Sequence, residues 1–542
     1  MQTKSFLSTV VMGLLAVSLL SACSKSERHD PTTLVRGNQA EPPTLDIAKV
    51  QDSFDMNVLY DAYEGLVDFD QADQPVPGIA QSWEISKDGK VYTFHLRHDA
   101  KWSNGEPLTA KDFVYSWQRA LDPKTASPYS FVVAKIKNGA AISAGKMPAS
   151  SLGVKIIDPY TLQITLQQPT SYFLRTLYLP VMYPLYEPAV KQYGDAFIQP
   201  GRMVSDGAYM LKEWVPNGYI LLTKNPYYYD AKDVKIDNVK FLPITDTSAE
   251  FQQYKSGGLD MTFAVPVDQY QQIQKDYPTQ FHTVQYIGTY FYDFNMAKGV
   301  FKNNLPLRQA LSMAIDRDTL VNEVVAENNQ PIYSMLPHLV EQGTFDQFKP
   351  YSWQALSYPE RVAIAQKLFT QAGYSAQHPL VFTLSYNTND LHKKVAIAMV
   401  SMWQQAFGNA IQVKLNNEEW NVLLTDRTAG NYELVRDDWI ADYDSVDEFN
   451  ELAMCNNPEN NARYCNPAYD KLIVAAEATT DPQLRIKLIE QAQTLAMNEY
   501  PIIPLFQFTY SRLVKPYVKG YDPTNNHLDM VHSKWIYFSD TN

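Results

Sequence analysis

The sequence predicts an α/β protein built from several domains, and three features of the chain lead to this prediction. Its 542 residues are enough for three or four domains of about 150 residues each, with large cores. Short β-type runs between turn clusters dominate residues 31–120, and strand and helix patterns alternate in the second half. Such alternation favours a partly parallel sheet.

The first half is expected to consist mainly of strands joined by tight turns. A helix is expected within residues 108–122, where Thr109 is a candidate N-cap and apolar residues recur at helical spacing, namely Phe113, Val114, Trp117 and Leu121. Two alternating runs flank Asp158-Pro159-Tyr160, a turn typical of a hairpin. Residues 209–245 again have the pattern of strands separated by Pro, Asn and Gly turns.

The second half combines helices with strands. The runs VFTLSYN (381–387) and IQVKLNN (411–417) predict strands. Helical patterns occupy residues 307–326, 359–372, 392–407 and 481–499. No internal repeat or low-complexity tract interrupts this order.

The first 23 residues have the pattern of a secretory signal. A single Lys precedes an apolar stretch from Phe6 to Leu20, which is too short for a stable membrane span. The sequence Leu20-Ser21-Ala22-Cys23 resembles the lipobox of bacterial lipoproteins, which implies that residues 1–22 are removed and Cys23 receives lipid chains. Residues 23–30 would form a polar tether. The alternative is a soluble export signal with an incidental Cys.

Charge and aromatic content restrict the class of partner. Lys and Arg total 46 against 59 Asp and Glu, a net charge of −13, which argues against a phosphate-binding surface and a nucleic acid partner. The chain holds 36 Tyr, 24 Phe and 9 Trp, more amphipathic rings than a core alone requires. Rings of this kind suit a site with apolar walls and wet edges.

The sequence contains none of the enzyme motifs that we sought. Residues 139–146 (GAAISAGK) superficially resemble a phosphate loop, but the spacing is wrong and Met147 replaces the required Ser or Thr. No G-x-S-x-G or H-E-x-x-H occurs, and we expect no catalytic residue, metal or cofactor. The acidic run 437–448 is typical of a solvated face. A paired-carboxylate hydrolase would have the same appearance in sequence, so a secreted hydrolase stays an alternative.

Two cysteines remain after the signal, Cys455 and Cys465, in CNNPENNARYC. An oxidising compartment favours a disulfide that closes this short polar loop. Free thiols are the alternative, and a zinc site would need further ligands that are not near in sequence.

One long segment resembles a known family. Residues 75–123, from PVPGIAQSW to QRALDP, are similar to the signature region of the extracellular solute-binding proteins that serve peptide and nickel ABC importers. Further matches follow along the whole mature chain, including SDGAYMLKEW (205–214), LRQALSMAIDRDTLV (307–321) and VRDDWIADY (435–443). The likeness is greatest to the branch that binds oligopeptides and murein tripeptide.

This resemblance implies a periplasmic-binding-protein fold, with two hinged lobes and one inserted domain. Residues 31–64, 188–287 and 510–542 would form the first lobe, 65–187 the extra domain and 288–509 the second lobe. The chain would cross the hinge near residues 287 and 509. Ligand contacts in both lobes would select the closed state.

The resemblance also assigns the part of the site that all peptides share. In the motif W-x-A-D-Y, which is Trp439 to Tyr443 here, Asp442 would pair with the ligand's N-terminal ammonium. The ligand would lie as an added strand along main chain, so the identities of these residues matter little. The main-chain residues would be Gln51, Asp52 and Ser53 on one side and Asp438, Trp439 and Ile440 on the other.

Cationic residues hold the ligand's carboxylate in the family, and the matching positions here are Arg427, Arg436 and His392. A fourth family position, a Lys, is Val325 in this chain. Aromatic walls of the side-chain pockets would be Tyr129, Phe263, Tyr286, Phe291, Trp420 and Trp439. Phe263 and Phe291 stand where related chains carry Tyr, and Ala264 where they carry Asn, which implies less polar and slightly larger pockets.

The sequence therefore predicts a monomeric, lipid-anchored protein that captures oligopeptides and delivers them to the permease and ATPase of an ABC importer. Its domain would lie in the periplasm or on the outer face of the cell membrane. A narrower ligand on the same fold, such as murein tripeptide, glutathione or haem, is the main alternative. A surface adhesin or chaperone is a third, since it would explain the anchor and the aromatic surplus.

Overall fold

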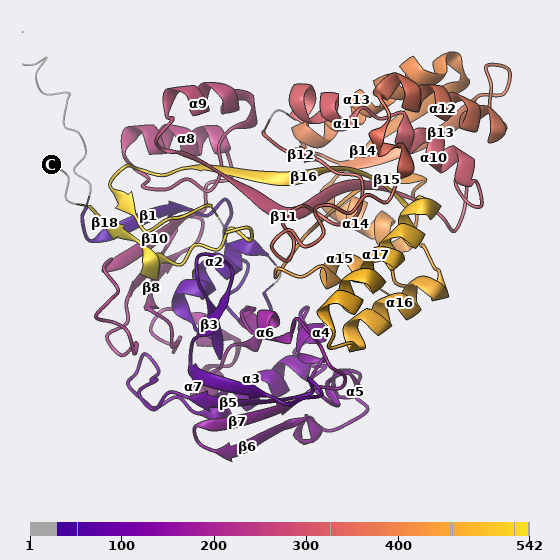
Figure 1. The fold of residues 1–542 in the computed structure, drawn as a ribbon. Helices are drawn as coiled ribbons and strands as arrows, with labels where there is room; N and C mark the ends of the chain where they lie inside the picture. Colours follow the sequence, from indigo (N-terminus) through magenta and orange to yellow (C-terminus); the bar gives the residue numbers. More distant parts are fainter. Residues whose placement is uncertain are drawn as a thin grey trace, which may run out of the picture.

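The structure is a computed structural model that describes residues 30–50, 52–325, 327–455, 457, 459–524 and 526–539. It has the expected α/β class, with three main sheets and helices around them (Figure 1). No helix in these ranges is both long and apolar enough to cross a membrane. The lipidation site at Cys23 lies outside the described residues.

The first main sheet has the strand order β1-β10-β9-β8, in which β1 is parallel to β10 and the other pairs are antiparallel. Its strands are β1 (Thr33–Gly37), β8 (Tyr209–Val215), β9 (Tyr219–Lys224) and β10 (Asn238–Leu242), as the sequence predicts for residues 209–245. Three helices belong to the same region: α2 (Ser53–Ala62), α8 (Thr247–Ser256) and α9 (Tyr270–Asp276). The short strand β17 (Val518–Lys519) pairs with β18 (Tyr537–Phe538), which lies beside β1 in Figure 1.

The second main sheet is antiparallel, with the order β4-β5-β7-β6, and it lies lowest in Figure 1. The expected hairpin is present, because β6 and β7 pair on either side of Pro159-Tyr160. The elements of this region are β2 (Val67–Phe69), β3 (Pro75–Pro77), β4 (Ala80–Ile85), β5 (Val91–Leu96), β6 (Val154–Asp158), β7 (Thr161–Thr165), α3 (Ala110–Leu121), α4 (Ser130–Val133), α5 (Gly139–Ser143), α6 (Phe173–Thr176) and α7 (Glu187–Tyr193).

Helix α3 confirms the helix expected within residues 108–122. Thr109 is its N-cap and forms a capping box with Asp112, whose side chain accepts from the Thr109 backbone N–H. Phe113 and Trp117 are fully buried, as their spacing predicts. The Trp117 indole N–H also donates to the Met182 carbonyl at 3.0 Å, which ties the helix to the following chain.

The third main sheet has six strands in the order β12-β16-β11-β15-β13-β14. β13 is parallel to both β14 and β15, which confirms the partly parallel sheet expected in the second half. The strands are β11 (Phe281–Phe294), β12 (Gln330–Pro331), β13 (Leu380–Asn387), β14 (Ile411–Glu418), β15 (Leu434–Ile440) and β16 (Ile502–Leu513). The helices are α10 (Leu305–Met313), α11 (Arg317–Thr319), α12 (Tyr358–Gln371), α13 (Asp390–Phe407), α14 (Trp420–Ala429), α15 (Asp447–Glu451), α16 (Pro467–Ala478) and α17 (Pro482–Glu499).

The helical pattern at 307–326 does correspond to helical structure, but the structure divides it into separate pieces. Helix α10 ends at Met313, and α11 is followed by a π-helical turn over Leu320–Val325. Arg317 is fully buried at the break, where its guanidinium donates to the Ser312 carbonyl at 3.1 Å and to the Pro504 carbonyl at 2.7 Å. A buried cation needs such acceptors, and the end of α10 supplies one of them.

Strands β11 and β16 are the longest in the protein's described part and pair with each other across the molecule (Figure 1). Their register shifts between the pairs Gln285–Thr509 and Thr289–Gln507, so that three residues of β11 lie opposite Phe508 alone. A bulge of this kind bends a strand. It lies where the chain is expected to cross between lobes, although the lobe boundaries themselves stay a prediction.

Candidate ligand-binding site

Asp442 lies just beyond the end of β15 and contacts a distant segment. Tyr129 lies just before α4, and its hydroxyl donates to Asp442 Oδ1 at 3.0 Å. Burial raises the pKa of the Asp442 carboxyl to about 6, and the hydrogen bond from Tyr129 opposes this rise. No Lys, Arg or His in the described ranges forms an ion pair with Asp442. The carboxyl therefore occupies a partly buried site that lacks a countercharge.

The contact between Tyr129 and Asp442 belongs to a wider interface between two segments. Lys135 Nζ lies 3.0 Å from Glu451 Oε1, and the Tyr172 hydroxyl donates to the same oxygen at 3.1 Å. The Tyr172 and Tyr443 rings stack with centroids 5.5 Å apart. The segment expected to form the extra domain thus packs against the loop that carries Asp442.

Strand β15 presents an open edge next to Asp442. It pairs with β11 from Leu434 to Ile440, but β13 pairs with it only at Leu434 and Val435. No other strand of the described chain pairs with the rest of that edge. The edge includes the expected main-chain residues Asp438, Trp439 and Ile440, of which Ile440 is 41% exposed. An unpaired edge can accept an extended chain as an added strand.

The second expected main-chain segment lies at the start of α2. Asp52 is the N-cap, and its side chain accepts from the backbone N–H groups of Phe54 at 3.0 Å and Asp55 at 3.1 Å. Ser53 is exposed as the first helical residue. Gln51 lies outside the described residues.

Two of the expected aromatic walls join one cluster. The Phe263 ring lies 6.0 Å from that of Phe54 and 5.4 Å from that of Tyr510, while Tyr510 lies 6.1 Å from Tyr286. The backbone N–H groups of Phe263 and Ala264 donate to the Glu250 carboxyl at 2.7 and 3.3 Å. The structure thus brings Phe263 and Tyr286 together beside α2.

The other expected walls are placed differently. Tyr129 stacks on Phe131 beside Asp442, with ring centroids 5.6 Å apart. Phe291 is almost fully buried opposite Asp437 in the sheet. Trp420 begins α14, and its side chain lies outside the described part of the structure.

Arg427 and Arg436 each form an ion pair with an aspartate inside the protein. The two aspartates point to opposite faces of β15. Arg427 pairs with the buried Asp437. Arg436 Nη2 lies 2.8 Å from Asp438 Oδ2, and its guanidinium lies 4.8 Å from the centre of the Tyr290 ring. Because side chains alternate along a strand, Asp437 faces away from Arg436 and Asp438.

His392 lies on the Arg436 face. Its Nδ1 is 3.0 Å from the Tyr290 hydroxyl, and burial together with the charge of Arg436 lowers the pKa of His392 to about 3. The imidazole is therefore neutral at physiological pH and can contact a carboxylate only as a neutral donor. Val325, the position of the family's Lys, is 1% exposed at the end of the π-helical turn.

The acidic run 437–448 is not the solvated face that its composition suggests. Asp437, Asp444, Asp447 and Glu448 are all buried. Arg175 lies 3.4 Å from Asp444, and Arg485 lies 2.7 Å from Asp447. Glu448 differs from these three because its carboxylate accepts backbone and indole N–H groups instead of a cation.

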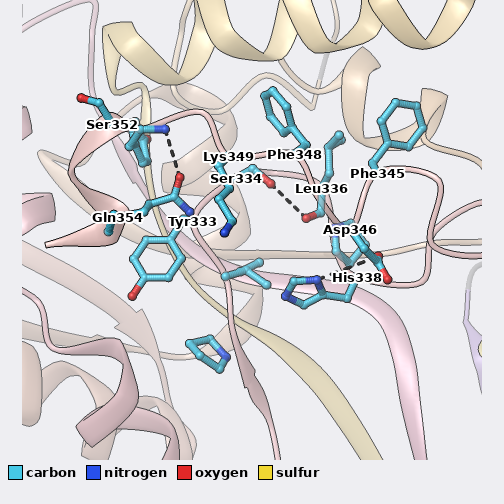
Figure 2. A pocket seen from close by; sticks show the side chains of 15 residues that line it. Tyr333, Ser334, Leu336, His338, Phe345, Asp346, Phe348, Lys349, Ser352 and Gln354 are labelled. Atoms are coloured by element: carbon cyan, nitrogen blue, oxygen red, sulfur yellow. Dashed lines mark hydrogen bonds and ion pairs between the residues drawn. The ribbon is translucent and has the colours of Figure 1, made fainter. Parts of the chain in front are cut away.

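A cavity of about 490 Å³ lies elsewhere, between residues 331–338 and 345–355 (Figure 2). His338, Asp346 and Lys349 lie on its wall, with His338 Nδ1 3.9 Å from Asp346 Oδ1. None of the expected ligand residues lines it. Among the described residues, no group of three or more His, Cys, Asp or Glu is placed to hold a metal ion.

Comparison with known proteins identifies the family. The family model for bacterial extracellular solute-binding proteins, family 5 Middle, matches residues 74–461. The chain belongs to family 5 of the bacterial extracellular solute-binding proteins. The periplasmic oligopeptide-binding protein OppA of Salmonella typhimurium is 39% identical over 526 residues, which cover 95% of this chain and 96% of OppA.

Solved structures of similar proteins have the same fold. The Escherichia coli murein tripeptide binding protein MppA matches with a TM-score of 0.83 and 37% identity, covering 94% of this chain and 99% of that chain. Haemophilus influenzae OppA in complex with RPPGFSPFR matches with a TM-score of 0.81 and 36% identity, over 94% and 99% of the two chains. The two-lobe periplasmic-binding-protein fold expected from the sequence is confirmed.

The sequence interpretation did not single out Glu448 as part of this candidate site. Its place six residues after Asp442 gives no sign of the contact, since both lie within one acidic run. Only the packing of α15 against the preceding loop brings the two carboxyls together.

Proposed function

We propose that this chain captures oligopeptides by their N-terminal ammonium and main chain and delivers them to an ABC importer. The observation that carries the proposal is Asp442, a partly buried carboxyl that lacks a countercharge in the described chain and lies beside an open strand edge. A peptide supplies both missing parts, an ammonium for Asp442 and an extended main chain for β15. The relatives named for oligopeptide and murein tripeptide binding support this assignment.

The opposite end of the ligand would meet Arg436, with Arg427 available from the other face of β15. Because both guanidinium groups already pair with aspartates, a ligand carboxylate must compete with Asp438 or Asp437. Because of this competition, the site would discriminate weakly between ligands whose carboxylates lie at different positions, so it could accept peptides of several lengths. Aromatic rings around Phe263 and Tyr286 would line the side-chain pockets.

We further propose that Cys23 carries a lipid anchor that holds the domain at the bacterial cell envelope. Cys455 and Cys465, whose Cα atoms lie 4.4 Å apart in a disulfide arrangement, would remain oxidised in that compartment. The permease and ATPase partners follow from the proposed delivery of peptides.

Native mass spectrometry of the mature protein, purified without denaturant, tests the proposal. We expect bound masses that resolve into a mixture of short peptides after the protein is denatured. A single defined species, such as a murein tripeptide, glutathione or haem, would replace the broad peptide ligand with a narrow one. If no ligand co-purifies and added peptides do not bind, the peptide-binding proposal is wrong. Cleavage of the added peptides would favour a hydrolase instead.

A further inference from the structure

Glu448 lies directly behind Asp442 and contacts the segment that carries it. Glu448 is only 6% exposed, within the short helix α15. Its Oε2 accepts the backbone N–H of Asp442 at 2.9 Å and the Trp439 indole N–H at 3.2 Å. Its Oε1 accepts the backbone N–H of Tyr443 at 3.0 Å.

These three donors all come from the motif Trp439 to Tyr443. A carboxylate that accepts several N–H groups fixes the conformation of the chain that donates them, because each donor would otherwise be buried without a partner. Glu448 therefore holds the turn after β15 and sets the direction in which the Asp442 side chain leaves the backbone.

The charge around this pair of carboxyls is unbalanced. The Tyr129 hydroxyl, before α4, donates to Asp442, and burial together with the charge of Asp442 contributes to the raised pKa values of Tyr60 in α2 and Tyr286 in β11. Other charged residues of α15 have their own partners, since Asp447 pairs with Arg485 and Glu451 with Lys135. No Lys, Arg or His of the described chain forms an ion pair with Glu448 or Asp442.

Two neighbouring carboxyls without a cation repel each other when both are ionised. Burial and the charge of Asp442 accordingly raise the pKa of Glu448 well above its usual range. A ligand ammonium placed at Asp442 would relieve this repulsion, and a neutral ligand end would not. The second carboxyl thus adds to the preference for a cation.

We infer that Glu448 is a positioning and specificity-determining residue for the ligand's N-terminal ammonium. It orients Asp442 through the Trp439–Tyr443 turn, and a ligand ammonium bound at Asp442 would favour the ionised form of Glu448, which then places a second negative charge near the amine. This inference rests on the proposed function, because it requires that the ammonium end of a ligand binds at Asp442.

The test compares free and N-acetylated peptides on wild-type protein, E448Q, E448D and the charge-matched control E323Q. Glu323 is exposed and lies in the π-helical turn, so E323Q removes one negative charge elsewhere. The probes are Lys-Ala-Ala, its tetra- and pentapeptide extensions with Ala, and the N-acetylated form of each. Isothermal titration calorimetry gives the affinities, and thermal unfolding checks that each variant is folded.

For wild-type protein and E323Q, we expect the free amine to bind at least tenfold more tightly than the acetylated form. In E448Q this ratio should fall at least fivefold, while the affinity for the acetylated peptide changes less than twofold. E448D keeps the charge but withdraws it by one methylene, so its ratio should lie between those of wild type and E448Q. If E448Q does not fold, E448D alone decides whether the ratio falls.

Two results would overturn the inference while leaving peptide binding intact. An unchanged ratio in folded E448Q or E448D would show that Glu448 has no part in recognising the amine. Equal losses for free and acetylated peptides would show a purely structural role. If wild-type protein binds none of the probes and no co-purified peptide, the proposed function fails first, and the role of Glu448 with it.

Discussion

The two ends of the candidate site differ in how their charges are balanced. At one end, Asp442 and Glu448 form no ion pair with any described residue. At the other end, Arg427 and Arg436 are each paired with an aspartate inside the protein. The difference shows which end has most to gain from a ligand. A ligand ammonium at Asp442 would meet unbalanced charge, whereas a ligand carboxylate would have to displace an existing partner at either arginine.

This difference also separates two kinds of residue within one acidic run. Asp437 serves the fold, because it balances Arg427 and accepts the Asn461 amide at 2.9 Å. The Asp442 side chain instead forms a hydrogen bond with the Tyr129 hydroxyl and no ion pair within the described chain. We therefore expect substitutions at the balanced end to reduce stability, and substitutions at the unbalanced end to reduce ligand affinity.

The largest expected effect is on stability, from R427A. Removing the guanidinium leaves Asp437 buried beside Asp293, whose pKa is already raised well above its usual range by burial and by Asp437. Breaking one side of a buried ion pair costs about 3–5 kcal/mol of the free energy of unfolding. Urea denaturation of R427A and wild-type protein measures this change. An unaltered midpoint would mean that Asp437 is not balanced by Arg427.

D442N should lower affinity for free-amine peptides with little change in stability. Truncating one partner of a desolvated charge pair costs about 2–5 kcal/mol in binding, which is roughly 30-fold or more. Calorimetry with Lys-Ala-Ala and its N-acetylated form measures the loss, and only the free amine should be affected. A similar loss for both peptides would indicate that the turn has been disturbed instead of the charge.

Local patterns were sufficient to predict much of the fold. Helix α3 follows from the capping box at Thr109 and the spacing of Phe113 and Trp117, since both signals lie within one short segment. The break in the helix expected at 307–326 could not be foreseen. It depends on Arg317 reaching the carbonyl of Pro504, which is 187 residues away in the sequence.

The sequence could predict which residues belong to the candidate site, but not how their charges are paired. The likeness to family 5 indicated Asp442, Arg427 and Arg436 from their motifs, but not whether each charge has a partner. That property depends on which elements pack together, such as α15 behind Asp442 or β11 beside Arg436. Sequence spacing alone could not distinguish the buried Glu448 from a solvated carboxylate of the same run.

The next effect in size is a dependence of peptide affinity on pH. Burial raises the pKa of Asp442 to about 6, and an ammonium bound beside a carboxyl lowers the pKa of that carboxyl. Glu448, whose pKa is also raised, shares this titration. Below pH 6 the ligand must therefore displace a proton from the Asp442–Glu448 pair, so affinity should fall by about tenfold for each pH unit and each proton displaced. It should fall again above about pH 8, where the ligand's own α-amino group loses its charge.

Titrations between pH 4.5 and 9 with free and acetylated peptides check this profile. The affinity of the acetylated peptide should fall neither below pH 6 nor above about pH 8, because this peptide carries no terminal ammonium. Titration of His392 should not change the affinity in this pH range, since its pKa is lowered to about 3. A decline below pH 6 that is the same for both peptides would assign the titration to a group other than Asp442.

The smallest expected effect comes from R436Q, which removes a cation from the balanced end. Asp438 is partly exposed and can be solvated when its partner is lost, so the fold should tolerate this change better than R427A. Affinity should fall by less than about tenfold, because a ligand carboxylate gains little from a cation that already has a partner. Comparing tri-, tetra- and pentapeptides shows which length places its carboxylate nearest Arg436. A loss as large as that of D442N would mean that the two ends hold the ligand equally, and that the internal pair with Asp438 opens without appreciable cost when the ligand arrives.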